Sequence, residues 1–353
     1  MTEDLDSLPQ TWPAPSKPRP IVIIGAGGIV NSAHIPAWRK AEFPIAGIFD
    51  LDAARTRDTA ERWGIHPFAA LSEATQQTGV IFDLATPPGA HRDVLAVLPE
   101  DSAVLIQKPM GSDLADATSI LQICRQRQLT AAVNFQLRFA PMVLALRAAI
   151  ANGMLGHIVD LEVHLNLLTP WHLFPFLKGL DRVEIAVHSV HYLDLIRALL
   201  GNPAGVYART LGHPSTDLAQ TRTSAILDFA SDVRCVLSIN HNHAFGRRFQ
   251  DATIRVEGDT GAALIKLGLL LDYPRGEPDE LWLFTGGDWR QVQLSGSWFP
   301  DAFVARMANL QRFVAGEDAV LDSTVEDAWD TMALVEACFR SARAPSTPVP
   351  QLP

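Results

Sequence analysis

Apolar residues in the first third of the chain fall into short runs separated by stretches with helical periodicity. The apolar runs, which predict buried strands, are residues 21–25, 44–50, 80–86, 103–109 and 130–135. The helical stretches between them are residues 33–41, 52–64, 91–99 and 113–128. Strands that are apolar on both faces and joined by helices are typical of a parallel, doubly wound sheet.

The pattern changes after about residue 156. Longer strands with partial alternation of apolar and polar residues are predicted at 161–169, 204–212, 223–230, 233–242 and 252–258. Helices are predicted at 183–200, 302–315 and 325–343. The first of them ends at a Gly-Asn-Pro stop signal. This part of the chain predicts an α/β domain with a large open, mainly antiparallel sheet.

Length and composition predict two domains and an ordinary globular protein. The chain has 353 residues, of which 48% are hydrophobic and 19% charged. We expect a flexible proline-rich arm at 1–19, a dinucleotide-type domain at 20–140, and a substrate and oligomerisation domain at 141–353. One arrangement open to the last helices of the second domain is to pack against the first domain.

Charge and cysteine content narrow the function class. A net charge of -10 without a Lys/Arg block argues against nucleic-acid binding. No window approaches the ~18 apolar residues of a membrane span, and the N-terminus has no signal-peptide pattern. Three widely separated cysteines without C-x-x-C spacing predict buried free thiols. We therefore expect a cytoplasmic protein with no membrane, nucleic-acid or structural-metal partner.

A glycine-rich turn follows the first strand. Gly25, Gly27 and Gly28 stand where backbone N–H groups could approach a pyrophosphate. Val30 replaces the usual third small residue, which predicts a slightly displaced helix or a shifted cradle. Asp50 closes the next strand, where a ribose-binding carboxylate belongs. Together these features predict a Rossmann domain.

The residues around Asp50 favour NAD over NADP. Its carboxylate would repel a 2′-phosphate, and Leu51 stands where a phosphate-binding Arg or Ser is usual. Arg55 and Arg57, which could bind a 2′-phosphate, favour NADP instead. Two loops at strand ends complete the expected cofactor edge: residues 85–88, with His91 three residues on, and the segment 107–109.

These motifs together resemble the Gfo/Idh/MocA oxidoreductase family. The resemblance rests on GAGGIV with H-x-P, ATPP with its following His, QKP, NFQLRFAP and HSVHYLD, and it covers residues 21–343. It implies bound NAD(P) and oxidation of an alcohol in a sugar, polyol or related compound. It also implies assembly into a homodimer or homotetramer through the open sheet.

The family's site residues carry over unevenly. The lysine of the family's E-K-P motif maps on Lys108, but its glutamate is Gln107 here. The histidine of the D-x-x-x-H motif maps on His191, but its aspartate is Val187. The cofactor contacts expected are Gly25, Gly27, Gly28, Ile29, Asp50, Thr86, Pro87, His91, Gln107 and Lys108.

A regular α-helix would put Glu184, His188 and His191 on one face, since offsets of three, four and seven residues coincide there. We therefore hypothesise that Glu184 or His188 replaces the missing aspartate electrostatically. A histidine is suited to take the hydroxyl proton, because its ordinary pKa lies near neutrality. Asp194 on the same helix is expected to be structural.

Several roles stay open. The substrate-binding candidates are Trp171, His172, Arg182 and His188, with Arg182 alternatively pairing with Glu184. A metal site is a further alternative, in which Glu184, His188 and His191 are joined by His164, His172, His241 or His243.

The leading function is a dehydrogenase that transfers hydride between NAD and a hydroxyl carbon of a sugar, polyol, or sugar-derived acid or lactone. Lys108 and His191 would handle the proton. The alternative is an NAD(P)-binding sensor or assembly protein that has lost catalysis. Val187 and Gln107 make that alternative plausible, whereas retention of Lys108 and His191 argues against it.

Overall fold

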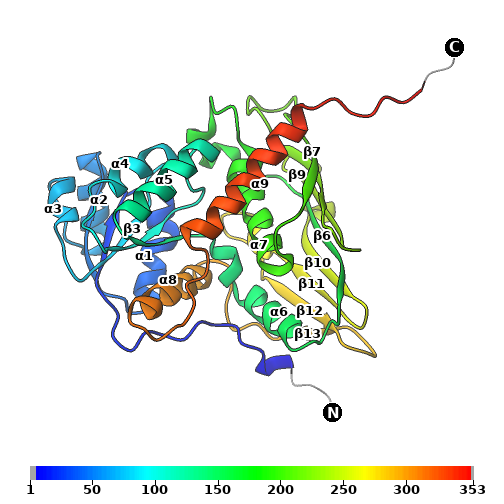
Figure 1. Ribbon diagram of the computed structural model, residues 1–353, viewed down its shortest axis with the longest axis horizontal. Helices are drawn as coiled ribbons and strands as arrows, with labels where there is room; N and C mark the ends of the chain where they lie inside the picture. The colour runs from blue at the N-terminus through cyan, green and yellow to red at the C-terminus, as the bar shows by residue number, and fades with distance from the viewer. Residues whose placement is uncertain (1–4, 351–353) are drawn as a thin grey trace.

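The first domain of the computed structural model, which describes residues 5–350, is built on a five-stranded sheet (Figure 1). All neighbouring strands are parallel, in the order β2-β1-β3-β4-β5. The strands are β1 (Ile21–Ile24), β2 (Ile45–Phe49), β3 (Ile81–Leu84), β4 (Ala103–Ile106) and β5 (Thr130–Val133). β1, β3 and β4 are buried along their whole length. β2 is added on one side of β1 and β3 on the other, so the order of strands reverses at β1. The carboxyl ends of β1 and β3 therefore border the crevice where such sheets bind ligands.

Helices flank this sheet, as the alternating pattern predicted. They are α1 (Ile35–Lys40), α2 (Ala53–Trp63), α3 (Leu71–Thr75), α4 (His91–Leu95) and α5 (Leu114–Gln126). The turn before α1 is π-helical over Val30–His34, and the side chain of Val30 is fully buried. The bulky residue at the third small position therefore coincides with a locally widened helix.

The second domain is built on an eight-stranded sheet in the order β13-β12-β11-β10-β6-β9-β8-β7. Its strands are β6 (Ile158–Asn166), β7 (Gly205–Leu211), β8 (Arg222–Asp228), β9 (Arg234–Asn240), β10 (Asp251–Gly258), β11 (Ala262–Lys266), β12 (Glu280–Phe284) and β13 (Arg290–Val292). Only the β6–β9 pair is parallel. Burial alternates along the central strands, and the outer face leaves Tyr207 and Ile226 exposed. The predicted open, mainly antiparallel sheet is confirmed, with three further strands at one edge.

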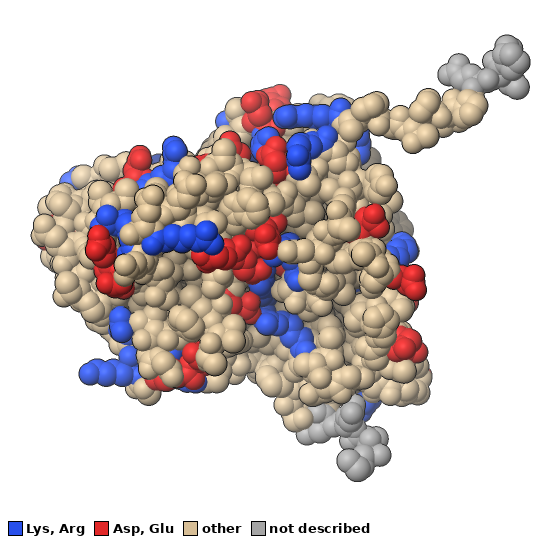
Figure 2. Space-filling view, in the orientation of Figure 1, with Lys and Arg blue, Asp and Glu red and all other residues tan. Residues whose placement is uncertain are grey.

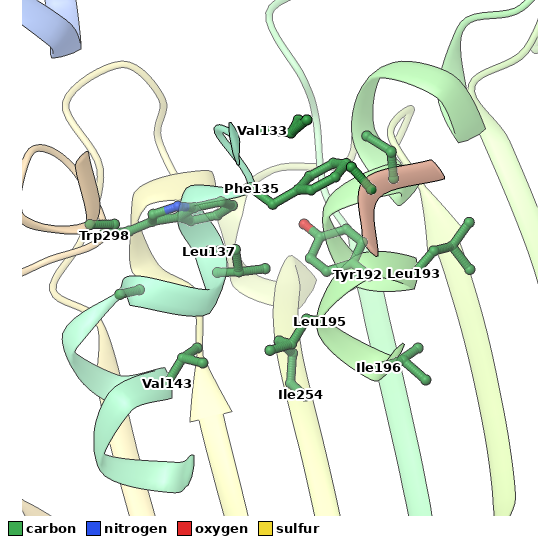
Figure 3. Close-up of a cluster of buried hydrophobic side chains, with 14 of the residues drawn as sticks. Val133, Phe135, Leu137, Val143, Tyr192, Leu193, Leu195, Ile196, Ile254 and Trp298 are labelled. Atoms are coloured by element: carbon green, nitrogen blue, oxygen red, sulfur yellow. The ribbon is translucent and has the colours of Figure 1, made fainter. Parts of the chain in front are cut away.

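The inner face of this sheet is covered by helices (Figure 1). These are α6 (Pro141–Ala151), α7 (Val190–Leu200) and α9 (Val325–Arg343). Figure 3 shows Tyr192 and Leu195 of α7 close to Phe135 and Leu137, which follow β5, above Ile254 of β10. The core is therefore continuous from the end of the first sheet to the inner face of the second.

The end of the chain returns to the first domain. Phe303 and Met307 of α8 (Asp301–Val314) lie in the same hydrophobic cluster as Trp38 of α1. Just before α9, the carbonyl of Ser323 accepts a hydrogen bond from the amide of Val133 in β5. Packing and backbone bonding therefore fix the two domains against each other.

The proline-rich arm differs from the expected flexible segment. Gln10 accepts a hydrogen bond from the amide of Ser295, and Trp12 donates its indole N–H to Asp318 at 2.7 Å. The backbone of Arg19 exchanges two hydrogen bonds with the side chain of Gln311. From residue 5 onward the arm lies packed along α8 and its neighbouring segments, and its first four residues lie outside the described part.

Two composition-based expectations can be compared with the fold. All three cysteines, Cys124, Cys235 and Cys338, are buried free thiols, as expected. Across residues 5–350, no helix combines the length and apolar character needed to cross a bilayer.

Candidate active site

The glycine turn forms a cradle at the carboxyl end of β1. Gly25 has a φ of +116°, and a Cβ there would lie 2.5 Å from the carbonyl oxygen of Ala85. At Gly27 and Gly28 a Cβ would meet no atom within 4 Å, so space is left above the turn. The Asp50 carboxylate reaches the same turn and accepts a hydrogen bond from the amide of Ala26 at 2.8 Å. The tight turn at Gly25, the open space beside the backbone of Gly27 and Gly28, and the carboxylate of Asp50 after β2 fit a bound dinucleotide.

Gly25→Ala is expected to weaken NADH binding by roughly 10- to 100-fold. The substitution forces a positive-φ alanine against the backbone of Ala85, and strain of a few kcal/mol must move the cradle. NADH fluorescence titration measures the effect. Gly153→Ala is the matched control, because Gly153 also has positive φ but has open space around it. Unchanged NADH affinity in Gly25→Ala would show that the cradle does not bind the cofactor.

The loop after β3 is held by a hydrogen bond from the buried side chain of His91. Its imidazole is fully buried and bonds to the carbonyl oxygen of Thr86 at 3.1 Å. Burial lowers its pKa to about 4, so the ring is neutral and acts as the donor. His91 therefore supports the loop, and its contact with the cofactor stays a prediction. The Thr86 hydroxyl is buried without a partner in the described structure, Pro87 is exposed and Ile29 is half-buried beside the glycines.

A buried chain of hydrogen bonds leads from the sheet to Lys108. Asp83 on β3 accepts from His34 Nδ1 at 2.8 Å and from the indole of Trp38 at 3.0 Å. The side-chain nitrogen of Gln107 lies 3.0 Å from His34 Nε2, and Gln107 Oε1 accepts the Lys108 amide at 2.8 Å. An amide at position 107 can donate to His34 Nε2 while His34 Nδ1 donates to Asp83. Sequence analysis missed His34 and Asp83, although a lone aspartate in an apolar strand was a usable signal.

Lys108 reaches across to the second domain. Its Nζ donates to the carbonyl oxygen of Val187 at 2.9 Å. Burial lowers the pKa of Lys108 from its ordinary 10.5 to about 8. Val187 stands where the family motif has an aspartate, and its side chain cannot accept a proton or a hydrogen bond. Its backbone carbonyl nevertheless supplies an acceptor for the lysine.

The segment before α7 does not have the α-helical geometry that the spacing predicted. Ile185–Ser189 is a π-helix, so the residue over Glu184 is Ser189, five positions on, whose hydroxyl donates to it at 2.8 Å. The fully buried Glu184 also accepts from Thr223 of β8, and His241 Nε2 lies 3.4 Å away. Placing Glu184 on the face of His191 was therefore wrong, because the wider turn directs it toward β8 and β9.

His188 and His191 remain together near Lys108. Burial lowers the pKa of each well below its ordinary value, and the charge of Lys108 acts in the same direction. Nδ1 of His191 is buried and has no partner in the described structure. The ring of His188 lies 4.6 Å from that of His241. Both site histidines are thus neutral near pH 7, and His191 presents an unused ring nitrogen.

Two tryptophans border these histidines. Trp171 meets His188 edge to face at 5.3 Å between ring centroids, and Trp298 meets His191 in the same way at 5.8 Å. Trp298, between β13 and α8, was not predicted from the sequence because it belongs to no motif and to no periodic segment. Asn134, directly after β5, was missed too, and both atoms of its buried amide lack partners in the described structure.

The other two substrate-binding candidates are Arg182 and His172. Arg182 makes a two-point ion pair with Glu336 of α9 and stacks 4.8 Å over Phe339. Its suggested pairing with Glu184 is therefore wrong. His172 is exposed on the loop after β6.

Of the histidines considered for a metal site, His188 and His241 lie side by side, whereas His164 lies apart from them. His164, between the buried residues Val163 and Leu165 of β6, points to the opposite face of the sheet from them. Among residues 5–350, no three His, Cys, Asp or Glu side chains are grouped so that they could hold a metal ion.

Comparison with known proteins places the chain among nicotinamide-dependent oxidoreductases. A family model described as "Oxidoreductase family, NAD-binding Rossmann fold" matches residues 19–135, and the "GFO/IDH/MocA C-terminal domain" matches residues 143–264. D-apiose dehydrogenase from Paraburkholderia graminis is 25% identical over 91% of this chain and 87% of its own. Inositol 2-dehydrogenase from Rhizobium meliloti is 22% identical over 90% and 95%.

A solved structure has the same fold over most of its length. An oxidoreductase from Agrobacterium radiobacter, in complex with NAD+, L-tartaric acid and magnesium, superposes with a TM-score of 0.75. It is 21% identical and is matched over 92% of this chain and 96% of its own. The two domain matches, the glycine cradle and the shared fold lead to one conclusion: this chain belongs to the Gfo/Idh/MocA family of oxidoreductases, with an NAD-binding Rossmann domain.

Proposed function

We propose that this protein is a dehydrogenase that transfers hydride between NAD and a hydroxyl-bearing carbon of a sugar, a polyol, or a sugar-derived acid or lactone. One observation carries the proposal. Lys108, which is half-buried, and the buried His191 come from the two domains and lie close enough for the lysine charge to lower the pKa of the histidine. A lysine with a pKa of about 8 beside a neutral imidazole, in a site between two domains, suits alcohol oxidation.

The residues of the first domain have the arrangement needed to hold NAD. The backbone of Gly25, Gly27 and Gly28 would bind the pyrophosphate, and Asp50 would bind the ribose. Bound NAD+ supplies the acceptor for hydride. The carboxylate of Asp50 disfavours a 2′-phosphate, which supports NAD over NADP.

The protein's own groups handle the proton. His191 Nδ1, buried and unpaired within residues 5–350, would accept the substrate hydroxyl proton. Lys108 Nζ would donate a hydrogen bond to the reacting oxygen while its second bond to Val187 O fixes its direction. In the reverse reaction the same groups return the proton. His188, neutral and beside His191, would contact the substrate.

The names of the relatives suggest which compounds to test first. Purified protein with NAD+ is supplied with D-apiose, myo-inositol, and a panel of aldoses, sugar acids and lactones, and the absorbance of reduced nicotinamide is followed. We expect turnover with at least one compound, and slower turnover when NADP+ replaces NAD+. NADH binding without turnover on the whole panel would favour a sensor or assembly protein. Absence of binding by either cofactor would contradict both functions.

A further inference from the structure

Two of the eight tryptophans are set apart by their indole N–H groups. Five donate to a protein oxygen: Trp12, Trp38, Trp63, Trp282 and Trp329. A sixth, Trp289, is 45% exposed and can donate to solvent. The indole nitrogens of Trp171 and Trp298 are buried, and no partner exists for either among residues 5–350. An indole N–H is only a donor, so each needs an acceptor that the described part of the chain does not supply.

The same two tryptophans border the histidines of the candidate site. The rings of Trp171 and His188 are perpendicular, with an interplanar angle of 90°, and those of Trp298 and His191 meet at 88°. His188 and His191 come from one helical segment, whereas the tryptophans come from two distant loops. The fold therefore places one unpaired indole donor beside each histidine.

Trp298 is held in a defined position. Its side chain is 3% exposed, and its backbone amide donates to Asp279 at 2.7 Å. Figure 3 shows its indole extending toward Phe135 over the segment that carries Leu137. The fixed, buried indole of Trp298 therefore offers an apolar ring face together with one hydrogen-bond donor, its N–H group. Such a surface suits a sugar, whose C–H groups pack on rings while its oxygens accept hydrogen bonds.

We propose that Trp171 and Trp298 are substrate-binding residues whose indole N–H groups donate to two oxygen atoms of the substrate, one on each side of the carbon that is oxidised. The inference rests on the proposed function and narrows it. The substrate is a polyhydroxylated compound with oxygens flanking the reacting carbon, and simple alcohols are poor substrates. Sequence analysis had named Trp171 but not Trp298.

Indole NMR tests the contact directly and does not depend on turnover. Protein labelled with ¹⁵N-tryptophan is saturated with NADH, and D-apiose, myo-inositol or glycerol is added as the probe. We expect downfield shifts of the Trp171 and Trp298 indole protons with at least one probe, assigned by Trp→Phe variants. The indoles of Trp38 and Trp282, which already donate to carboxylates, serve as internal controls. Unchanged Trp171 and Trp298 signals with all three probes would overturn the proposal.

Kinetics of Trp298→Phe provide the second test on the panel compound with the highest turnover. The variant keeps an aromatic ring and loses the donor, so KM for the compound should rise about three- to tenfold. NADH affinity should not change. Trp289→Phe is the matched control, because that indole is exposed and outside the site. An unchanged KM in Trp298→Phe would contradict the proposed contact, whereas failure of the wild type to turn over any compound would contradict the proposed function.

Discussion

Lys108→Met is expected to lower kcat by about 10²- to 10⁴-fold, the usual range for loss of a group that assists proton transfer. Methionine has a similar length but neither donates a hydrogen bond nor carries a proton. Initial rates of NADH formation with the panel compound of highest turnover measure the loss. Lys40→Met is the matched control, since Lys40 is an exposed lysine that bonds to Asp301. A Lys108→Met rate within a few-fold of the wild type would exclude Lys108 from the reaction.

The pH dependence of the same variant separates chemistry from folding. Lys108 donates to the reacting oxygen and has a folded pKa of about 8, so kcat/KM for oxidation should fall as the pH rises through about 8, and Lys108→Met should lack this step. The unfolded lysine keeps its ordinary pKa of 10.5, so between these values the unfolded chain binds more protons. The wild type therefore gains stability as pH rises from 8 to 10.5. At pH 7 the variant has lost a costly buried charge, so we expect it to be at least as stable as the wild type in urea.

Asp194→Asn is expected to destabilise the protein by about 3–5 kcal/mol. Arg138 donates to both carboxylate oxygens of Asp194 at 2.6 Å, and their side chains are 4% and 1% exposed. Removal of the negative charge leaves a buried guanidinium whose remaining ionic partners, within the described residues, are Asp322 and Asp327. These residues tie η4 (Gln136–Phe139), which follows β5, to α7 and the start of α9. Chemical denaturation measures the change in unfolding free energy.

The outer part of the same ionic cluster supplies the control. Figure 2 shows acidic side chains gathered over the start of α9, in the middle of the face it presents. Asp330 of α9, 42% exposed, pairs with Arg197. Asp330→Asn should lower the free energy of unfolding by less than about 1 kcal/mol, because solvent replaces the lost ion pair. If Asp194→Asn and Asp330→Asn lowered the free energy of unfolding equally, burial would not decide how strongly these ion pairs stabilise the protein.

The order of elements and the glycine turn after β1 were predictable because each has a local signature. A buried parallel strand is a short apolar run, and a strand followed by glycines and a helix leaves few backbone geometries open. Asp50 could be placed because strand length fixes where the next strand ends. The contacts of the arm at residues 1–19 were not predictable, since its proline content indicates an extended chain but not the partners, such as Asp318 for Trp12, that lie near the other end of the chain.

The sequence by itself determined the two-domain α/β architecture, the glycine cradle, and the placing of Lys108 and His191 as the groups to examine. Only the tertiary structure decided what surrounds them. The π-helical turn at Ile185–Ser189 removed Glu184 from the face of His191, and the backbone of Val187 supplied an acceptor to Lys108. Trp298 joined the site from a distant loop. Periodicity records which side of an element is buried, whereas contacts between domains depend on how elements far apart in sequence pack together.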